Sequence, residues 1–324
     1  MIIGLDIGYG WTKVTAGREL VSFPSIIGPA VTIRYHNDLI RNGRGHALAL
    51  DGSEWFTGDL AALQSPFTIS PRARERADTV LRVLALDALE RLGARNEVRM
   101  VTGLPVSWYE DRGQLSDCLI GEHVYQIDGE PHRLIVSDVA VVPQPFGSFF
   151  RVVLNTEGML INNELAQGRV GIVDIGTHTT DLVLVDELRY IEPGSGSVDV
   201  AMARALELIG RAIEDVHALA LEIHQVDTAL RKGYVTVCGE RKDIGDLARP
   251  HLAAVAQKVL DKTTTLWGDG RDLSAVIVTG GGAYAMGEHV KARYPHAVIL
   301  PNPERGNVEG FYRYGLRKWG RRCG

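Results

Sequence analysis

Cysteine, long apolar runs and an excess of one charge are all scarce in this chain of 324 residues. The three cysteines, Cys118, Cys238 and Cys323, are far apart, whereas a metal site needs closely spaced ligand pairs. No segment reaches the roughly 20 apolar residues that a membrane helix needs. The net charge is −5, so the basic face of a protein that binds duplex DNA directly is not expected.

The remaining composition is that of an ordinary globular protein, with 45% apolar and 23% charged residues. From Met1 to Asp6 the chain enters an apolar strand pattern at once, without the basic and apolar stretches of a signal peptide. An odd number of cysteines without such a signal indicates a reducing compartment. We therefore expect a cytoplasmic protein that does not bind a membrane. The one tight basic cluster, Arg317 to Arg322, is interpreted as a solvated helix end.

Strand and helix patterns alternate along the chain, which predicts an α/β fold, and the length predicts two domains. The opening meander of strands ends at Pro24. From about residue 25 to 75 the periodicity is poor, so we expect a small inserted subdomain there. A helix follows, with Asp78 as its N-cap and Gly93 as its stop.

Three later segments carry helical patterns. The mostly apolar stretch from Phe146 to Leu165 predicts one long helix, and Val198 to Ile213 predicts another. Pro250 lies inside a third pattern, from Asp243 to Leu266, which is therefore either kinked or divided in two.

The strand pattern restarts near Gly168, half-way along the chain. The strand-turn-strand segment from Gly171 to Val185 is a weak repeat of the segment from Gly4 to Thr15. A duplicated unit of this kind predicts two similar lobes that face each other across a cleft.

The first chemical motif is the turn of the first repeat, Asp6 to Lys13. A carboxylate at a strand end is suited to hydrated Mg²⁺, and glycines let backbone N–H groups approach a phosphate. Lys13 adds a positive charge there. Alone this motif is a weak signal, because an Asp-x-Gly hairpin is usually only a turn.

The second motif, Asp174 to Asp181, has the same arrangement at the start of the second repeat. Two such hairpins, one in each lobe, are suited to hold a triphosphate from both sides. The third motif is Thr279 to Tyr284, with three consecutive glycines directly after a buried strand pattern. Flexible linkers do not follow a buried strand so closely, so we interpret these glycines as a close approach to a nucleotide.

The order and spacing of the three motifs resemble those of the actin, Hsp70 and sugar-kinase superfamily. Asp6 to Lys13 matches its first phosphate loop, Asp174 to Asp181 its second, and Ile277 to Tyr284 its adenosine motif. Pro143 to Gly147 and Asn307 to Gly310 match its two connecting segments, so that the resemblance covers nearly the whole chain. The short length and the Pro-Gln at the first connection are most similar to ParM-like prokaryotic actins, of the plasmid segregation type.

The resemblance implies an actin-like ATPase fold, with two lobes around a nucleotide cleft. Lobe I would span 1–154, lobe II 155–305, and a last helix at 306–324 would return to lobe I. Asp6 would hold Mg²⁺ through water, Gln144 would orient the attacking water, and Asp174 would help to polarise it. The residues implied to bind the nucleotide are Gly8, Gly10, Thr12, Lys13, Gly176, Thr177, Thr179, Gly280, Gly281 and Gly282.

By the same resemblance, the chain would bind and hydrolyse MgATP and polymerise head to tail into dynamic filaments. The task implied is plasmid or DNA segregation, or intracellular positioning. GTP in place of ATP is left open. The expected partners are further copies of the chain and a DNA-binding adaptor protein. The mild acidity fits such an indirect contact with DNA, with no direct binding to nucleic acid.

A small-molecule kinase of the same superfamily is the alternative. Such a kinase needs a carboxylate base beside the acceptor hydroxyl. The first connecting segment offers Gln144 instead, which suits a water molecule better than a sugar. Asp138 lies near in the sequence and keeps the kinase alternative open.

Overall fold

The computed structural model of the chain describes residues 1–33, 46–71 and 77–320, and they form two compact units. Unit 1 contains Met1–Asn163 and Arg305–Gly324, and unit 2 contains Glu164–Glu304. Unit 1 is therefore built from two segments that are far apart in the sequence. The predicted insertion at 25–75 and the basic cluster at 317–322 lie partly outside the described residues, and Cys323 lies wholly outside them.

Unit 1 contains a mixed sheet. Its described strands are β1 (Ile2–Ile7), β2 (Trp11–Thr15), β3 (Leu20–Pro24), β4 (Ile27–Pro29), β5 (Leu48–Leu50), β6 (Ser53–Thr57), β7 (Asn96–Leu104), β8 (Gly121–Ile127) and β9 (Glu130–Pro143). They run in the order β3-β2-β1-β7-β9-β8-β5-β6-β4. β1, β7 and β9 are parallel neighbours, and the other pairs are antiparallel. The predicted insertion therefore contributes strands that continue the main sheet through β8.

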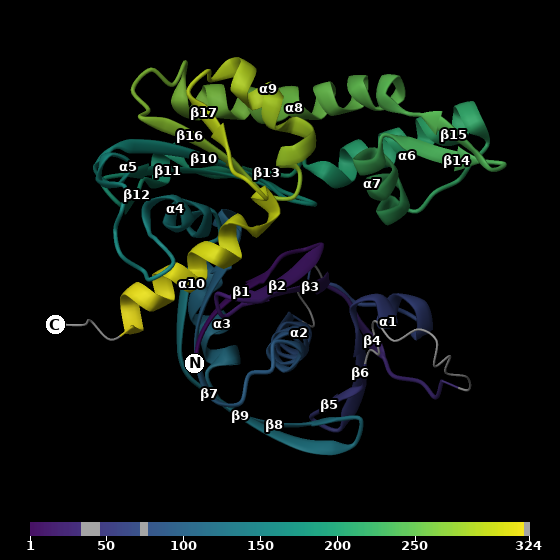
Figure 1. Cartoon of the computed structure of the whole chain (residues 1–324), viewed down its shortest axis with the longest axis vertical. Helices are drawn as coiled ribbons and strands as arrows, with labels where there is room; N and C mark the ends of the chain where they lie inside the picture. Colours follow the sequence, from purple (N-terminus) through teal and green to yellow (C-terminus); the bar gives the residue numbers. More distant parts are fainter. Residues whose placement is uncertain (34–45, 72–76, 321–324) are drawn as a thin grey trace. The chain divides into compact units, whose positions relative to one another are not determined.

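The helices of unit 1 pack on both faces of this sheet. They are α1 (Gly58–Gln64), α2 (Ala77–Arg91), the 3₁₀ helix η2 (Val106–Asp111), α3 (Arg112–Leu119), α4 (Pro145–Val153) and α10 (Gly306–Trp319). The last helix, α10, contacts β1, β2, β7 and α4. The sheet curls around α2, as Figure 1 shows. Every residue from Val83 to Leu89 is buried, which is the pattern of a helix enclosed on all sides.

One charged side chain, Asp87, lies within this enclosed part of α2 and is fully buried. Arg91 Nε donates to its Oδ2 at 2.8 Å, and the Thr57 hydroxyl donates to the same oxygen at 2.5 Å. His46 Nε2 lies 2.6 Å from Asp87 Oδ1. Because a buried carboxylate is costly unless it is paired, these contacts tie α2 to β6 and to the chain at residue 46.

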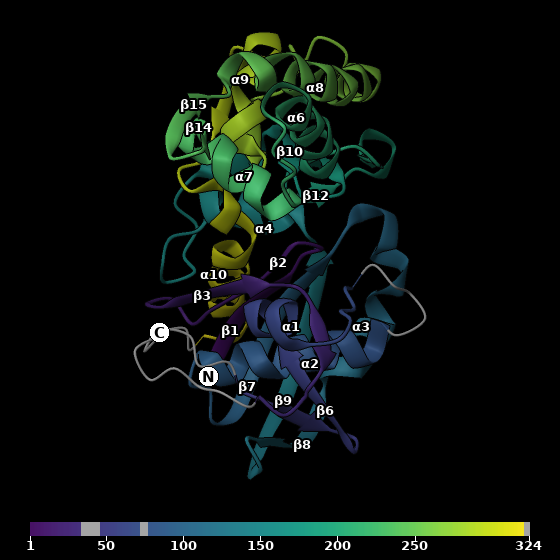
Figure 2. The ribbon, with the colours of Figure 1, turned by 90° about the vertical axis from the view of Figure 1, so that its right-hand side faces the viewer.

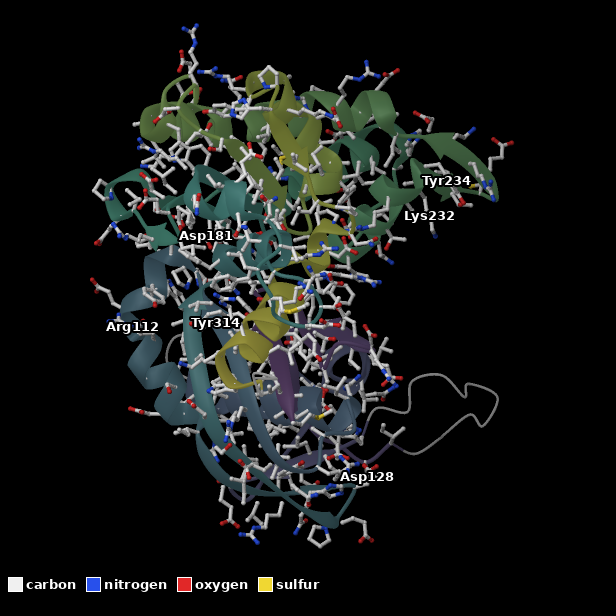
Figure 3. All side chains as sticks on the ribbon, turned by 60° about the vertical axis from the view of Figure 1, so that its left-hand side comes forward. Arg112, Asp128, Asp181, Lys232, Tyr234 and Tyr314 are labelled. Atoms are coloured by element: carbon white, nitrogen blue, oxygen red, sulfur yellow. The ribbon has the colours of Figure 1, made fainter. Side chains whose placement is uncertain are left out.

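The His46–Asp87 ion pair predicts a pH dependence of stability. The contact with Asp87 raises the pKa of His46 above its ordinary 6.5, and it outweighs burial and Arg91, which lower that pKa. Asp128, on the turn between β8 and β9 (Figure 3), raises it further. The pair therefore stabilises the fold fully below pH 6.5, and this contribution is lost as the pH rises through the raised pKa.

We expect the unfolding free energy of wild type to fall as the pH rises above 6.5, and that of a His46→Gln variant to fall less. Urea titrations at a series of pH values measure this difference. His224→Gln, a change on the exposed start of α7 (Ile223–Lys232), is the control and should keep the wild-type slope. If the unfolding free energies of wild type and His46→Gln changed equally with pH, the His46–Asp87 pair would contribute nothing to the pH dependence of stability.

Unit 2 contains a second mixed sheet and a separate hairpin. The strands are β10 (Arg169–Ile175), β11 (Thr180–Asp186), β12 (Arg189–Tyr190), β13 (Gly196–Val198), β14 (Tyr234–Val237), β15 (Glu240–Asp243), β16 (Ala275–Thr279) and β17 (Ala297–Ile299). The sheet order is β12-β11-β10-β16-β17, with β13 also paired to β11, and β14 and β15 form a separate two-stranded sheet. β10, β16 and β17 are parallel neighbours.

The helical elements of unit 2 are α5 (Asn163–Gln167), η3 (Glu192–Gly194), α6 (Met202–His217), α7, α8 (Gly245–Trp267), α9 (Ala283–Arg293) and η4 (Pro303–Arg305), of which α5 and η4 extend across the unit boundaries in sequence. α8 and α9 cover its sheet (Figure 2). α7 and the β14–β15 hairpin lie beside α6, away from that sheet (Figure 1). Within the described ranges, no helix is both long enough and apolar enough to cross a membrane.

The two units repeat one strand plan, as the sequence repeat predicted. The order β3-β2-β1-β7-β9 in unit 1 corresponds to β12-β11-β10-β16-β17 in unit 2. In both, an antiparallel meander of three strands is followed by two strands parallel to its first.

Two predictions about helices are wrong, and one of the alternatives for a third is excluded. The helix predicted from Phe146 to Leu165 is wrong, because α4 ends at Val153 and a turn follows, in which Asn155 Oδ1 accepts two backbone N–H groups and Gly158 has a positive φ of 77°. Asp78 lies in the first turn of α2 rather than at its N-cap. Pro250 lies inside α8, which is a single helix, so the alternative of two helices is excluded. Pro250 is the sixth residue of this helix, and because proline has no N–H, the carbonyl group four residues earlier is left without its usual intrahelical donor.

Candidate functional site

The first motif forms the hairpin between β1 and β2. Gly8 N donates to Trp11 O at 3.1 Å and closes the turn. Asp6 is the cross-strand neighbour of Lys13, so both side chains lie on one face of the sheet. Lys13 Nζ lies 3.4 Å from Asp6 Oδ2. The structure therefore places the predicted metal-binding carboxylate and the predicted phosphate-binding lysine together.

Gln144 joins this pair from a distant part of the chain. It stands at the N-cap position of α4, but its side chain does not cap the helix. Instead Gln144 Nε2 donates to Asp6 Oδ1 at 2.9 Å, in a buried hydrogen bond between residues 138 positions apart. The carboxylate of Asp6, itself only 4% exposed, thus has a positive partner on one oxygen and an amide donor on the other.

The remaining predicted residues of the first motif are placed differently. Thr12 pairs with Ile7 and is fully buried, and its hydroxyl lies 2.8 Å from the Ser25 hydroxyl. The Thr12 side chain therefore faces away from Asp6 and Lys13, and only its backbone lies in the hairpin. Gly10 O accepts a hydrogen bond from Ser25 N at 3.0 Å, which fixes the outer part of the turn.

The second motif forms the equivalent hairpin in unit 2, between β10 and β11. Gly176 N donates to Thr179 O at 3.0 Å, the same closure as in the first hairpin. Asp174 here pairs across the strands with Asp181, where the first hairpin has Lys13. Asp181, labelled on β11 in Figure 3, is 4% exposed and accepts a hydrogen bond from the Ser197 hydroxyl on β13. Two buried carboxylates therefore lie side by side in unit 2, a feature that the sequence prediction missed.

The loop of the second hairpin is fixed to the start of α6. Ala203 N donates to Thr177 O at 2.7 Å, and Met202 N donates to Gly176 O at 3.4 Å. Thr177 and Thr179 are half-buried. Because the first N–H groups of α6 are bonded to carbonyl oxygens of the loop, the loop cannot move without this helix.

The three glycines lie against the second hairpin. Gly280 has a positive φ of 86°, and a Cβ there would overlap Asp174 Oδ1. Gly282 N donates to Ile175 O at 2.8 Å, and its Cβ position is 2.6 Å from Met202 Cγ. Gly281 has no atom within 4 Å of its Cβ position. Packing alone thus explains glycine at 280 and 282, whereas Gly281 leaves space beside the backbone.

A cluster of side chains next to the glycines was not predicted. Tyr284, in the first turn of α9, donates its hydroxyl to Asp227 Oδ1 on α7 at 2.7 Å. Arg231 lies with its guanidinium 4.1 Å from the centre of the Tyr284 ring and donates to Asp227 Oδ2 at 2.9 Å. Burial and the hydrogen bond to Asp227 raise the pKa of Tyr284, so this phenol stays protonated and remains a donor. The sequence motifs did not predict this contact, because Asp227 and Tyr284 are 57 positions apart.

Two family models match this chain. Residues 4–147 match the model of the N-terminal domain of actin-like proteins, and residues 172–292 match that of the C-terminal part of archaeal actin homologues similar to MreB. The chain belongs to the actin-like superfamily. The resemblance and the fold predicted from the sequence are thereby confirmed.

Three relatives illustrate the similarity of this actin-like chain. An archaeal actin homologue of Thermoplasma volcanium is 23% identical over 322 residues, which cover 94% of each chain. A crystal structure of an archaeal actin homologue in complex with ADP has a TM-score of 0.80 at 20% identity and covers 98% of this chain and 99% of its own. A 15-stranded ParM filament from Clostridium botulinum has a TM-score of 0.76 at 21% identity, with 97% of this chain and 98% of its own covered.

Proposed function

We propose that the chain is an actin-like ATPase that binds and hydrolyses MgATP and polymerises into dynamic filaments. The observation that supports this most directly is the hydrogen bond from Gln144 to Asp6. It places an amide, which can orient water without acting as a strong base, beside the carboxylate proposed to hold the hydrated metal. Phosphoryl transfer to water depends on positioning and charge neutralisation more than on covalent chemistry, and this pair would supply the positioning of the attacking water and of the hydrated metal.

The remaining predicted residues would each contact a different part of the nucleotide. Backbone N–H groups of the hairpins at Gly8–Gly10 and Gly176–Thr179 would bind the phosphates, and Lys13 would neutralise their charge. Asp174 would help to polarise the attacking water. Gly281, which has open space beside it, would lie nearest the α-phosphate and the nucleoside. The complex of an archaeal actin homologue with ADP supports an adenine nucleotide, and GTP remains an alternative to ATP.

The residues present fit a magnesium ion held mainly by water and phosphate oxygens. Mg²⁺ keeps several waters and binds to proteins through one or two carboxylates. Asp6 offers one buried carboxylate, and the described ranges contain no group of three or more metal-ligating side chains. When bound, the ion would neutralise charge on the β- and γ-phosphates. Asp6 would hold its water shell, while Gln144 would orient the attacking water.

Self-association and its biological use are the further part of the proposal. The similarity to a ParM filament supports head-to-tail assembly, which gives open filaments when the contacts do not close a ring. We propose that such filaments move or position plasmid or other DNA in the cytoplasm through a DNA-binding adaptor protein. The net charge of −5 fits this indirect contact better than direct binding.

A sugar-type kinase is the second candidate, and the surroundings of Asp138 speak against it. Asp138 Oδ2 accepts a hydrogen bond from Trp319 Nε1 of α10 at 2.9 Å. A carboxylate engaged in this way is poorly suited to accept a proton from a substrate hydroxyl. The group from the first connecting segment that lies beside Asp6 is the amide of Gln144, which favours water as the acceptor of the phosphoryl group.

The proposal predicts assembly that depends on nucleotide. Purified protein with Mg²⁺ should scatter more light after addition of ATP, and the scattering should decay as phosphate is released. A non-hydrolysable analogue should give filaments that persist, visible by electron microscopy. Persistent monomers over a range of protein and salt concentrations would refute assembly, and absence of phosphate release would refute hydrolysis. Phosphate transfer to a hydroxylated metabolite would instead establish the kinase.

A further inference from the structure

Two glycines bring α4 and α10 into backbone contact within unit 1. A Cβ on Gly310 of α10 would overlap the carbonyl oxygen of Gly147 on α4. A Cβ on Gly147 would lie 2.6 Å from the Cα of Asn307 and 2.7 Å from Phe311 Cε1. The two helices therefore cross with no side chain between them at this point. Tyr314 of α10 (Figure 3) also stacks on Phe150 of α4, with ring centres 4.4 Å apart.

This close crossing lets Asn307 reach the first turn of α4. Asn307 Oδ1 accepts a hydrogen bond from Ser148 N at 3.2 Å and another from the Ser148 hydroxyl at 2.8 Å. Both residues are buried, with Asn307 8% exposed and Ser148 fully enclosed. A buried acceptor with two donors from one residue fixes the position of that residue closely. Asn307 thus holds the start of α4 from a position 159 residues later in the chain.

The start of α4 is where Gln144 stands. Gln144 is the N-cap residue, yet its side chain donates to Asp6 and leaves its own helix uncapped. Its backbone is held on both sides, since Gln144 N donates to Leu104 O at 2.8 Å and Gln144 O accepts from Gly147 N at 3.0 Å. The Cβ position of Gly103 lies 2.6 Å from Phe311 and 2.9 Å from Gln144 Cγ, so these groups are in close packing.

We propose that Asn307 is a positioning residue for Gln144. By holding Ser148, it fixes the first turn of α4 and therefore the direction from which the Gln144 amide reaches Asp6. This inference rests on the proposed hydrolysis of ATP, in which Gln144 orients the attacking water. The segment from Asn307 to Gly310 would thus influence the rate of ATP hydrolysis, in addition to connecting the two parts of the fold.

The test is the single-turnover rate of ATP hydrolysis in an Asn307→Ala variant. Since a misplacement of about 1 Å can cost on the order of 10²-fold, we expect a loss on the order of tenfold. Nucleotide affinity should stay within about threefold, because no nucleotide contact is removed. Asn155→Ala is the matched control: Asn155 Oδ1 also accepts two N–H groups, from Glu157 at 3.0 Å and Met159 at 2.8 Å, without contact to Gln144. It should hydrolyse ATP at the wild-type rate.

A double-mutant cycle separates positioning from general destabilisation. If Asn307 acts through Gln144, then Asn307→Ala should slow hydrolysis no further in a Gln144→Ala background. Equal losses of rate in the two backgrounds would overturn the proposal, and so would a wild-type rate for Asn307→Ala or an equal loss for Asn155→Ala. A wild-type protein that binds but does not hydrolyse ATP would instead refute the proposed function itself.

Discussion

Replacement of Gln144 with alanine is expected to slow ATP hydrolysis by about two orders of magnitude, because water would lose the group that orients it. Nucleotide affinity should change by less than about threefold, since Gln144 contacts Asp6 and has no proposed contact with the nucleotide. Single-turnover phosphate release measures the rate, and titration with a fluorescent nucleotide measures the affinity. Filaments of this variant should form with ATP and persist, because the proposed disassembly depends on hydrolysis.

The control for this change is Gln114→Ala. Gln114 on α3 also donates its side-chain amide to a carboxylate, that of Asp78 at 3.3 Å, but on the exposed surface of unit 1. This variant should hydrolyse ATP and disassemble at wild-type rates. A Gln144→Ala variant that kept the wild-type rate would remove Gln144 from the mechanism. One that failed to bind nucleotide would assign it to binding instead.

Replacement of Gly310 with alanine is expected to destabilise unit 1 by about 3 kcal/mol, near the upper end for overpacking a close contact. The added methyl group would overlap the carbonyl oxygen of Gly147, and it also lies only 2.9 Å from Arg151 N. Backbone atoms cannot rotate away as a side chain can, so α4 and α10 must separate. On the order of 10 °C should be lost from the melting temperature, measured by circular dichroism.

Gly113→Ala provides the matched control for Gly310→Ala. Gly113 also lies in a helix, α3, but no atom stands within 4 Å of its Cβ position. Alanine there should be neutral or stabilise the fold by up to about 1 kcal/mol, since it reduces the entropy of the unfolded chain. Similar melting temperatures for the two variants would show that the helices tolerate separation at Gly310.

The hairpins were predictable from the sequence because each is built from contacts within a few residues. Each motif contains the turn and the strand residues on both sides of it, at Asp6 to Lys13 and at Asp174 to Asp181. The repeat in the sequence therefore predicted that the two hairpins are alike. Gln144 was found only through the resemblance, because its contact with Asp6 joins residues 138 positions apart. The roles predicted for these residues remain to be tested by the experiments above.

Other features lay beyond what local patterns could show. The helix predicted from Phe146 to Leu165 followed its apolar content, but the side chain of Asn155 bonds the backbone in a turn and ends α4 early. The short strands between residues 25 and 75 have no periodicity of their own. They are strands because β5 pairs with β8, β6 with β5 and β4 with β6. Asn307 was identified only as part of a connecting segment. Its contact with Ser148 and the contact between Asp227 and Tyr284 were not predicted, since each joins residues that are distant in sequence.

The discontinuity of unit 1 also has a consequence for how the protein is made on the ribosome. β1, β2 and β7 are synthesised early, but α10, which packs against them, follows only after all of unit 2. Unit 2 is continuous in sequence, so it can complete its core while the apolar face beneath α10 is still uncovered. Contacts between such distant segments are slow to form. Unit 1, which begins first, is therefore the part that finishes folding last, and its uncovered sheet is where a nascent chain would most need protection by a chaperone.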